Sequence, residues 1–253
     1  MMNLVQALQA ESYKVITVIG GGGKTSTLLT LAKELRLKQK NFFITTTTKM
    51  AARELAAFPI VYGEHFDKLL EEIRKALPKQ NCIGLATRLN SSGKILGIPA
   101  QWIDILTSLY PDFYFLVEGD GAAQKPFKIP GEHEPVIPSS TRLVVGIIGA
   151  EIIGQRLTES NVHRAQLMSQ LFNVPLGKEL SLNVIADVLT SQYGYLKNVP
   201  ASCDFAIIIN KVESKVNYEN GEKLAHFLLE RGMVRVILTA LQTDRPVREV
   251  FCL

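Results

Sequence analysis

The sequence predicts an α/β fold built on a doubly wound, mainly parallel β-sheet. Short apolar runs rich in β-branched and aromatic residues alternate with segments of helical periodicity, which is the order of elements that gives such a sheet. Two of the runs, residues 113–117 and 143–148, are apolar throughout. Continuous apolar runs are typical of parallel strands that are covered on both faces. A third observation is a glycine-rich turn, residues 20–23, between the first strand and the first long helix.

The expected strands and helices can be placed in chain order. Pro99 and Asn161 are suited to start two of the helices, and Gly232 is suited to stop the last one. The apolar runs predict strands at residues 13–19, 41–46, 82–87, 113–117, 142–148, 205–210 and 234–239. Apolar stripes spaced three and four residues apart predict helices at residues 28–35, 66–77, 102–109, 162–172 and 224–228.

One segment departs from the alternation. Residues 82–98 hold two apolar runs around Asn-Ser-Ser-Gly at 90–93, a pattern that predicts an antiparallel hairpin. No repeat, low-complexity tract or linker is visible, so we interpret residues 1–253 as a single α/β domain with a possible helical subregion at 155–203.

Composition excludes several classes of protein. The chain has 253 residues, of which 47% are hydrophobic and 21% charged, as in an average globular protein. The net charge is only +4, with no basic run interleaved with aromatics, so we expect no nucleic-acid partner. The longest uncharged apolar stretch, 143–150, is too short to span a membrane. Three scattered cysteines outside any CxxC favour the reducing cytoplasm.

The strongest local signal is a phosphate-binding loop. A β-branched strand leads into four glycines, then Lys-Thr-Ser, then an amphipathic helix. Such a loop wraps backbone N–H groups around phosphate, its lysine reaches the β- and γ-phosphates, and its threonine ligates Mg²⁺. Val18 stands where the standard GxxxxGK[ST] pattern has its first glycine, so the loop is shorter and resembles that of Mur-type ligases. The predicted nucleotide-binding residues here are Gly20, Gly21, Gly22, Gly23, Lys24, Thr25 and Ser26.

The strand at 113–117 runs into two carboxylates, Glu118 and Asp120. A carboxylate at the carboxyl end of a parallel strand is well placed to hold a metal ion beside bound phosphates. The run resembles the metal-binding Val-Glu-Gly segment of dethiobiotin synthetase, which favours Glu118 as the Mg²⁺ ligand together with Thr25. Asp120 is then a candidate for orienting water or a second ligand.

Four threonines and Lys49 close the strand at 41–46. Thr47, Thr48 or Lys49 could touch phosphate or metal there. The alternative is a plain strand end at which Thr48 caps a following helix.

A proline-rich segment, residues 125–138, follows the acidic strand end. Its prolines stiffen the backbone, and its charged side chains suit a second substrate. We take Lys128, Glu132, His133 and Glu134 as candidates for that substrate, with His133 as a possible acid or base. The alternative is a surface connection without a function.

The strand at 205–210 ends in Asn210-Lys211-Val212-Glu213. GTPases carry Asn-Lys-x-Asp after such a strand, and its carboxylate pairs with guanine. Asn210, Lys211 and Glu213 are therefore candidates for binding the base, with a modest preference for guanine. The alternative is an ordinary polar strand exit.

Four blocks taken together, GGGGKTS, TTTTKM, LVEGDGA and KPFKIPGEHEPVIP, resemble the YqeC family. The resemblance extends over nearly the whole chain. It implies a nucleotide-binding accessory protein that helps to mature a selenium-dependent molybdenum hydroxylase or its cofactor. The implied partners are therefore the nucleotide, the molybdenum cofactor or a selenium species, and a molybdenum hydroxylase.

We therefore predict a P-loop NTPase-like protein that binds ATP or GTP with Mg²⁺, in which Lys24, Asp120 and His133 are the candidate catalytic residues. Two alternatives stay open. The protein could be a binding module that nucleotide switches without turnover, or an ATP-dependent ligase of the Mur type.

Overall fold

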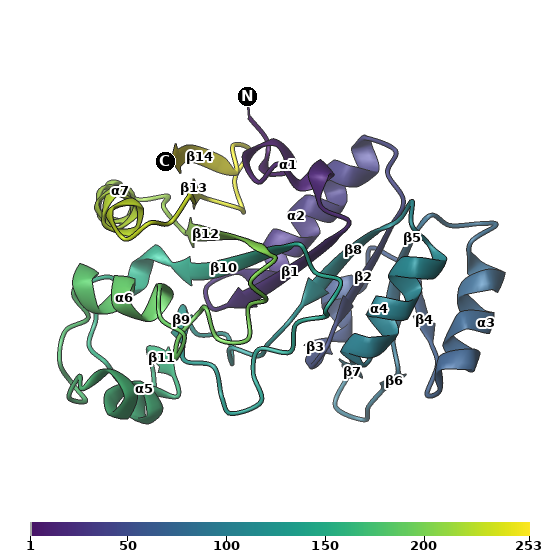
Figure 1. The fold of residues 1–253 in the computed structure, drawn as a ribbon, viewed down its shortest axis with the longest axis horizontal. Coiled ribbons are helices and arrows are strands. Elements are labelled where there is room, and N and C mark those ends of the chain that lie inside the picture. The colour runs from purple at the N-terminus through teal and green to yellow at the C-terminus, as the bar shows by residue number, and fades with distance from the viewer. Residues whose placement is uncertain (1) are drawn as a thin grey trace.

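A nine-stranded sheet forms the centre of the molecule in the computed structural model, which describes residues 2–253 (Figure 1). The strand order across the sheet is β14-β13-β12-β10-β1-β8-β2-β5-β4. In that order the strands are Val247–Cys252, Arg235–Thr239, Asp204–Asn210, Leu143–Gly149, Val15–Gly20, Tyr114–Glu118, Phe42–Thr46, Cys82–Ala86 and Ile60–Tyr62.

Every neighbouring pair in this sheet is parallel except β13 with β14. The predicted doubly wound, mainly parallel sheet is therefore confirmed, and each of the seven expected strands forms within two residues of its predicted ends. The sequence did not predict the two edge strands, β4 and β14. Both are short or only half buried, so neither carries the continuous apolar run that marks a central strand.

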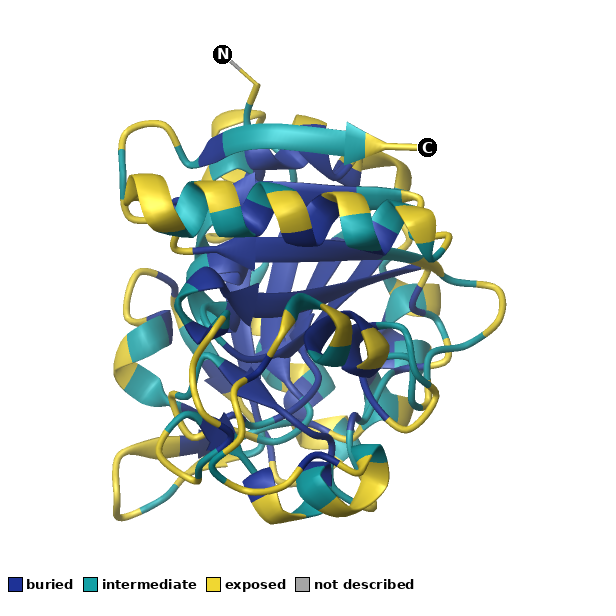
Figure 2. Cartoon of the chain, turned by 90° about the vertical axis from the view of Figure 1, so that its left-hand side faces the viewer, coloured by how far each residue is buried: buried dark blue, intermediate teal, exposed yellow. Residues whose placement is uncertain are grey.

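Helices cover both faces of the sheet (Figure 1). On one face, alternate residues of β1 such as Ile16 and Val18 share a core with α1 and α2. On the other face, Val15 and its neighbours pack with α3 and α4, and the odd-numbered residues of β12 pack with α5, α6 and α7. Figure 2 shows the central strands buried between these layers. The helices α1 to α7 are Leu4–Ala7, Lys24–Leu37, Phe66–Ala76, Ala100–Leu109, Ala165–Phe172, Leu182–Leu189 and Lys215–Glu230, and short 3₁₀ helices lie at Ala10–Ser12, Ala52–Leu55 and Ala150–Ile152.

The helix ends are partly as predicted. Pro99 caps α4, and Gly232, with φ of +84°, follows the end of α7. The helix expected from residue 162 starts later, at Ala165, with Arg164 as its cap. Asn161 is not the cap because Val162–His163 (β11) pairs with Phe127–Lys128 (β9). Of the proposed subregion 155–203, only α5 and α6 are helical.

The predicted hairpin is present, but it is smaller than the segment suggested. Arg88–Leu89 (β6) pairs antiparallel with Lys94–Leu96 (β7), whereas β5 stays in the main sheet. The other edge of β7 pairs with Lys49–Ala51 (β3) to complete a small three-stranded sheet. Thr48 therefore precedes a strand, and the expectation that it caps a helix is wrong. Within residues 2–253, no helix has the length and apolar character needed to cross a membrane.

Candidate functional site

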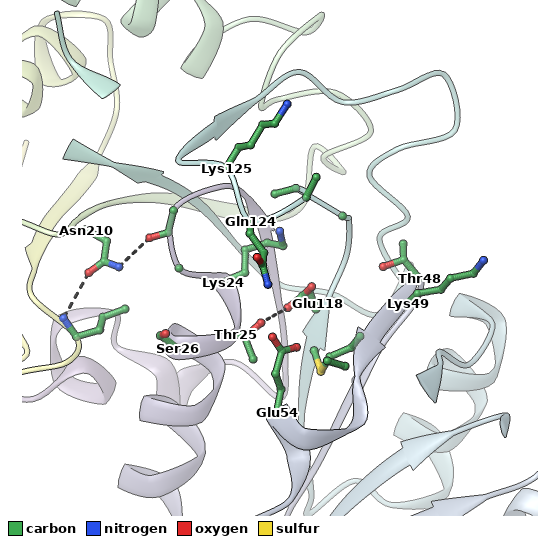
Figure 3. A pocket seen from close by; sticks show the side chains of 18 of the residues that line it. Lys24, Thr25, Ser26, Thr48, Lys49, Glu54, Glu118, Gln124, Lys125 and Asn210 are labelled. Carbon is green, nitrogen blue, oxygen red and sulfur yellow. Dashed lines mark hydrogen bonds between the residues drawn. The ribbon is translucent and has the colours of Figure 1, made fainter. Parts of the chain in front are cut away.

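The polar strand ends meet at one edge of the sheet. Because β1, β2, β8, β10, β12 and β13 are parallel, their carboxyl ends lie side by side, which is where open α/β sheets bind ligands. A cavity of about 1120 Å³ lies there (Figure 3). Its lining includes Gly22 to Ser26, Thr47 to Ala51, Glu54, Lys94, Glu118, Gly121 to Lys125, Glu134, Asn210, Lys211, Glu213, Leu241 and Gln242.

The glycine loop packs against neighbouring backbone so closely that side chains larger than hydrogen would not fit. Gly22 has φ of +80°, and a Cβ atom there would lie 2.2 Å from the backbone nitrogen of Gly149. The Gly22 N–H donates to the Lys125 carbonyl at 3.0 Å, and the Gly21 N–H donates to the Ile147 carbonyl at 2.9 Å. The loop is thus fixed between the segment after β8 and the end of β10 before any ligand binds.

The start of α2 presents free donors to the cavity. The first bond within the helix runs from the Thr27 N–H to the Gly23 carbonyl at 2.9 Å. The N–H groups of Lys24, Thr25 and Ser26 therefore have no partner inside the helix, and all three residues line the cavity. Free N–H groups at the positive end of a helix dipole are suited to bind a phosphate.

Lys24 is almost completely buried, with 6% of its surface exposed. Its Nζ donates to the Gly20 carbonyl at 2.7 Å and lies 3.3 Å from Oδ1 of Asp120. The ammonium group has three N–H donors, and these two contacts leave one donor for a ligand in the cavity.

Thr25, in the first turn of α2, contacts Glu118, the last residue of β8. The Thr25 hydroxyl donates to Oε2 of Glu118 at 3.0 Å (Figure 3). Burial raises the pKa of Glu118 to about 7, although Lys24 and the Thr25 hydrogen bond act against that rise. A buried carboxylate that is so costly to ionise fits a position where a cation binds beside it.

Glu54 adds a second carboxylate that the sequence did not single out. It lies in the 3₁₀ helix after β3, lines the same cavity, and its charge contributes to the raised pKa of Glu118. Within residues 2–253, no group of three or more His, Cys, Asp or Glu side chains could hold a metal ion. Mg²⁺ beside a nucleotide needs only one or two protein ligands, because phosphate and water oxygens complete its shell.

Asp120 and Lys128 belong to a buried chain of alternating charges. Both carboxylate oxygens of Asp120 accept the Gly20 N–H at 3.1 Å, and Oδ2 lies 3.0 Å from Lys128 Nζ. Lys128 also donates to the Gly121 carbonyl and to Glu134, each at 2.6 Å, and Arg164 donates to Glu134 at 2.7 Å. All three donors of Lys128 are therefore used within the protein, which favours a structural role over substrate binding.

Of the four residues of the proline-rich segment taken as second-substrate candidates, Glu134 is the one that lines the cavity. Burial alone would raise its pKa, but the hydrogen bonds from Arg164 and Lys128 lower that pKa to about 2. His133 and Glu132 point to solvent instead, with 91% and 88% of their side chains exposed. Neither of these two residues lines the cavity.

The Asn210 side chain links the glycine loop to the end of β13. Its Nδ2 donates to the Gly22 carbonyl at 2.8 Å, while its Oδ1 accepts the Thr239 hydroxyl at 3.0 Å and the Leu241 N–H at 3.4 Å. Lys211 is paired with Glu151, and Glu213 lies exposed on the cavity lining. Asn210 thus positions the glycine loop, and Glu213 is the one of the three candidates whose side chain has no ion pair or hydrogen bond among the described residues.

Gln124 and Tyr195 also lie at the site and were not predicted from the sequence. Figure 3 shows the Gln124 side chain reaching towards Lys24 and Glu118. Ala123 and Gln124 have φ of +48° and +60°, which places both in the left-handed backbone conformation. That conformation is strained for residues other than glycine, and such strain is common at functional sites. Tyr195 is buried beneath the phosphate loop and donates to the Ile147 carbonyl at 3.0 Å. Nothing in the local sequence marks either residue, and the contact of Tyr195 with Ile147 joins positions 48 residues apart.

The central strand, the glycine loop and the helix that begins at Lys24 define the class of the protein, which is an α/β protein with a P-loop NTPase-like doubly wound fold. More particularly, the chain belongs to the YqeC family, whose model, described as YqeC protein, matches residues 16–166. All four sequence blocks that suggested the family lie inside that match. The chain is also 32% identical over 237 residues to the "Uncharacterized protein YqeC" of Escherichia coli (strain K12), and this alignment covers 94% of the chain and 91% of that relative.

Proposed function

We propose that this protein binds a purine nucleoside triphosphate with Mg²⁺ in the cavity at the carboxyl edge of the sheet. The observation that carries the proposal is the convergence there of the free N–H groups of α2, the Lys24 ammonium and the Thr25–Glu118 pair. Lys24 and the N–H groups would hold the phosphates. Thr25 and Glu118, with Glu54 nearby, would hold the metal ion.

Hydrolysis is the reaction that this geometry supports best. A water oxygen would bond to the γ-phosphorus and the bond from the γ-phosphorus to the β,γ-bridging oxygen would break, so that the nucleoside diphosphate, phosphate and a proton leave. Gln124 replaces Asp120 as our candidate for orienting that water, because both oxygens of Asp120 are already engaged by Gly20 and by lysines. A glutamine amide can both accept from water and donate to phosphate.

The purpose of the nucleotide is proposed from family membership. We infer that turnover or binding serves the maturation of a selenium-dependent molybdenum hydroxylase or its cofactor in the cytoplasm. The alternative without turnover, a nucleotide-switched binding module, has the same site. The two differ in whether purified protein hydrolyses the nucleotide without a partner.

The test is thermal unfolding of the purified protein with ATP, GTP and their diphosphates, with and without Mg²⁺. A ligand at about 100 times its dissociation constant should stabilise the fold by about 2.7 kcal/mol. Stabilisation by triphosphates that depends on Mg²⁺ supports the proposal. No stabilisation by any of the four nucleotides, at millimolar concentration, would contradict it.

The same titration tests the base. Glu213 can accept two hydrogen bonds from guanine, so we expect GTP to bind modestly tighter than ATP. In Glu213→Ala the ratio of the two affinities should fall towards one, while Lys223→Ala, a change outside the cavity lining, should leave it unchanged. Equal or tighter binding of ATP by the unmutated protein would remove the guanine preference and leave the phosphate site intact.

A further inference from the structure

The cavity extends on both sides of the Thr25–Glu118 pair. Asn210 lies on one side of that pair, and Thr48 and Lys49 lie on the other side (Figure 3). The volume of about 1120 Å³ exceeds the range of about 300–1000 Å³ for pockets that hold one small ligand. If the base lies towards Asn210 and Glu213, the region beside Lys49 is left for a second ligand.

The small sheet brings two lysines onto one of its faces. Ala51 and Lys94 are directly paired across β3 and β7, and directly paired residues point to the same side. Lys49 is two residues from Ala51 and therefore shares that side. Met50 and Ile95, on the opposite face, are buried, which fixes the register and keeps Lys49 and Lys94 at the cavity as diagonal neighbours.

These two lysines differ from the others at the cavity, because they lack a carboxylate partner. Lys24 pairs with Asp120, Lys125 with Glu159, and Lys211 with Glu151. Among the ion pairs of residues 2–253, none includes Lys49 or Lys94. Two lysines on neighbouring strands, both lining the cavity and without counter-charges, create a positive potential there that favours a dianion.

We propose that the face of β3 and β7 carrying Lys49 and Lys94 binds an anionic second substrate of the phosphomonoester class. A phosphomonoester has a charge of about −1.5 to −2 at pH 7, which matches two lysines, and Ala51, on the same face, offers apolar contact at the cavity wall. The ligand would lie beside the terminal phosphate of the nucleotide, so the assignment rests on the proposed nucleotide site. It replaces the exposed Glu132–His133 pair as the place where the second substrate binds.

Phenyl phosphate is a suitable probe, and phenol is its uncharged control. The full-length protein is first saturated with Mg²⁺ and a non-hydrolysable triphosphate, so that the phosphate loop is filled, and is then titrated calorimetrically. We expect phenyl phosphate to bind and phenol not to bind. Lys49→Gln and Lys94→Gln should each weaken binding about fivefold, the double variant should abolish it, and Lys49→Arg should retain most of it. Lys79→Gln, which removes an exposed lysine away from the cavity, should bind as the unmutated protein does.

Two results would overturn the assignment. One is phenyl phosphate affinity that is absent, or equal in all variants. The other is affinity that disappears when the triphosphate analogue saturates, because the probe would then have occupied the phosphate loop. If the protein binds no nucleotide, the proposed function fails, and the titration is repeated in Lys24→Ala without nucleotide. If phenyl phosphate binding in that variant still depends on Lys49 and Lys94, the second-substrate site is supported. If the binding does not depend on these lysines, the second-substrate site is overturned as well.

Discussion

Lys24 and Asp120, which are 96 positions apart in the sequence, form a buried ion pair beside the phosphate loop, with 3.3 Å between Nζ and Oδ1. Asp120 also accepts the Gly20 N–H and contacts Lys128. These two further partners hold the Asp120 carboxylate in place even without Lys24, and the carboxylate in turn holds the Lys24 ammonium. Because Lys24 also donates to the Gly20 carbonyl, its ammonium is held at the glycine loop by contacts within the protein alone.

The first prediction concerns Lys24→Ala. Asp120 keeps Lys128 and the Gly20 N–H as partners, so we expect the free energy of unfolding to fall by only about 1–2 kcal/mol. Triphosphate affinity should fall at least about tenfold, which corresponds to about 1.4 kcal/mol of binding free energy. Calorimetry and circular dichroism on the same sample measure both effects. Lys33→Ala, an exposed change on the same helix, is the control, and unchanged affinity in folded Lys24→Ala would refute the phosphate-loop assignment.

The second prediction uses the raised pKa of Glu118. Folding raises that pKa from 4.5 to about 7, so between these pH values the folded chain holds a proton that the unfolded chain has lost. The stability of the metal-free protein should therefore decrease as the pH rises from 4.5 to 7, by up to about 3 kcal/mol. Glu118→Gln cannot ionise and should be more stable than the unmutated protein at pH 8 but not at pH 5.

Thermal unfolding without Mg²⁺ at the two pH values measures this difference, with Glu64→Gln as the exposed control. Mg²⁺ should strengthen triphosphate binding in the unmutated protein and much less in Glu118→Gln. If both proteins lose the same affinity when Mg²⁺ is removed, Glu118 is not the metal ligand and Glu54 becomes the better candidate.

The third prediction concerns Glu134, whose pKa is lowered by folding, so that its effect on stability changes with pH in the opposite direction to that of Glu118. Its pKa is lowered from 4.5 to about 2 by Arg164 and Lys128, so its contribution to stability is complete above pH 4.5 and is lost as the pH falls towards 2. Glu134→Gln should lower the free energy of unfolding by about 3 kcal/mol at pH 7, and less at pH 3. Glu132→Gln, on the exposed neighbour, should change little at either pH. A pH-independent difference would show that the charge of Glu134 is not what stabilises the fold.

The fourth prediction concerns His133→Ala. The side chain is 91% exposed and lies outside the cavity lining, so nucleotide affinity and thermal stability should stay unchanged. Hydroxylase activation, measured in cells that lack the native gene, then tests whether this surface residue takes part in the proposed maturation. Full activation supports the exposed-surface interpretation, whereas loss of activation with normal nucleotide binding would restore His133 as a functional residue.

The fifth prediction separates two roles of Asn210. As a link between the Gly22 carbonyl and the β13 loop, it should act on the loop and not on the base. Asn210→Ala should lower the free energy of unfolding by about 1–3 kcal/mol and should weaken the binding of ATP and of GTP by the same factor. A change in the ratio of the two affinities, as expected for Glu213→Ala, would instead assign Asn210 to base recognition.

The sequence by itself determined the alternation of strands and helices, the glycine loop between β1 and α2, and the sheet edge on which the candidate site lies. These follow from local information, because apolar periodicity marks each element and parallel strands necessarily place their carboxyl ends together. Glu118, Thr47 and Asn210 could therefore be assigned to one site without coordinates. The edge strands β4 and β14 lacked that local signal.

Only the tertiary structure decided which of the charged residues face the cavity and which face one another. Lys128 and His133 come from the same proline-rich segment, yet one is buried among Asp120, Glu134 and the Gly121 carbonyl and the other is exposed. Glu54 and Lys94 enter the site because a short sheet folds back beside β2. The physical reason is that a charge is placed by its partners. Those partners lie far along the chain, where no local pattern in the sequence records them.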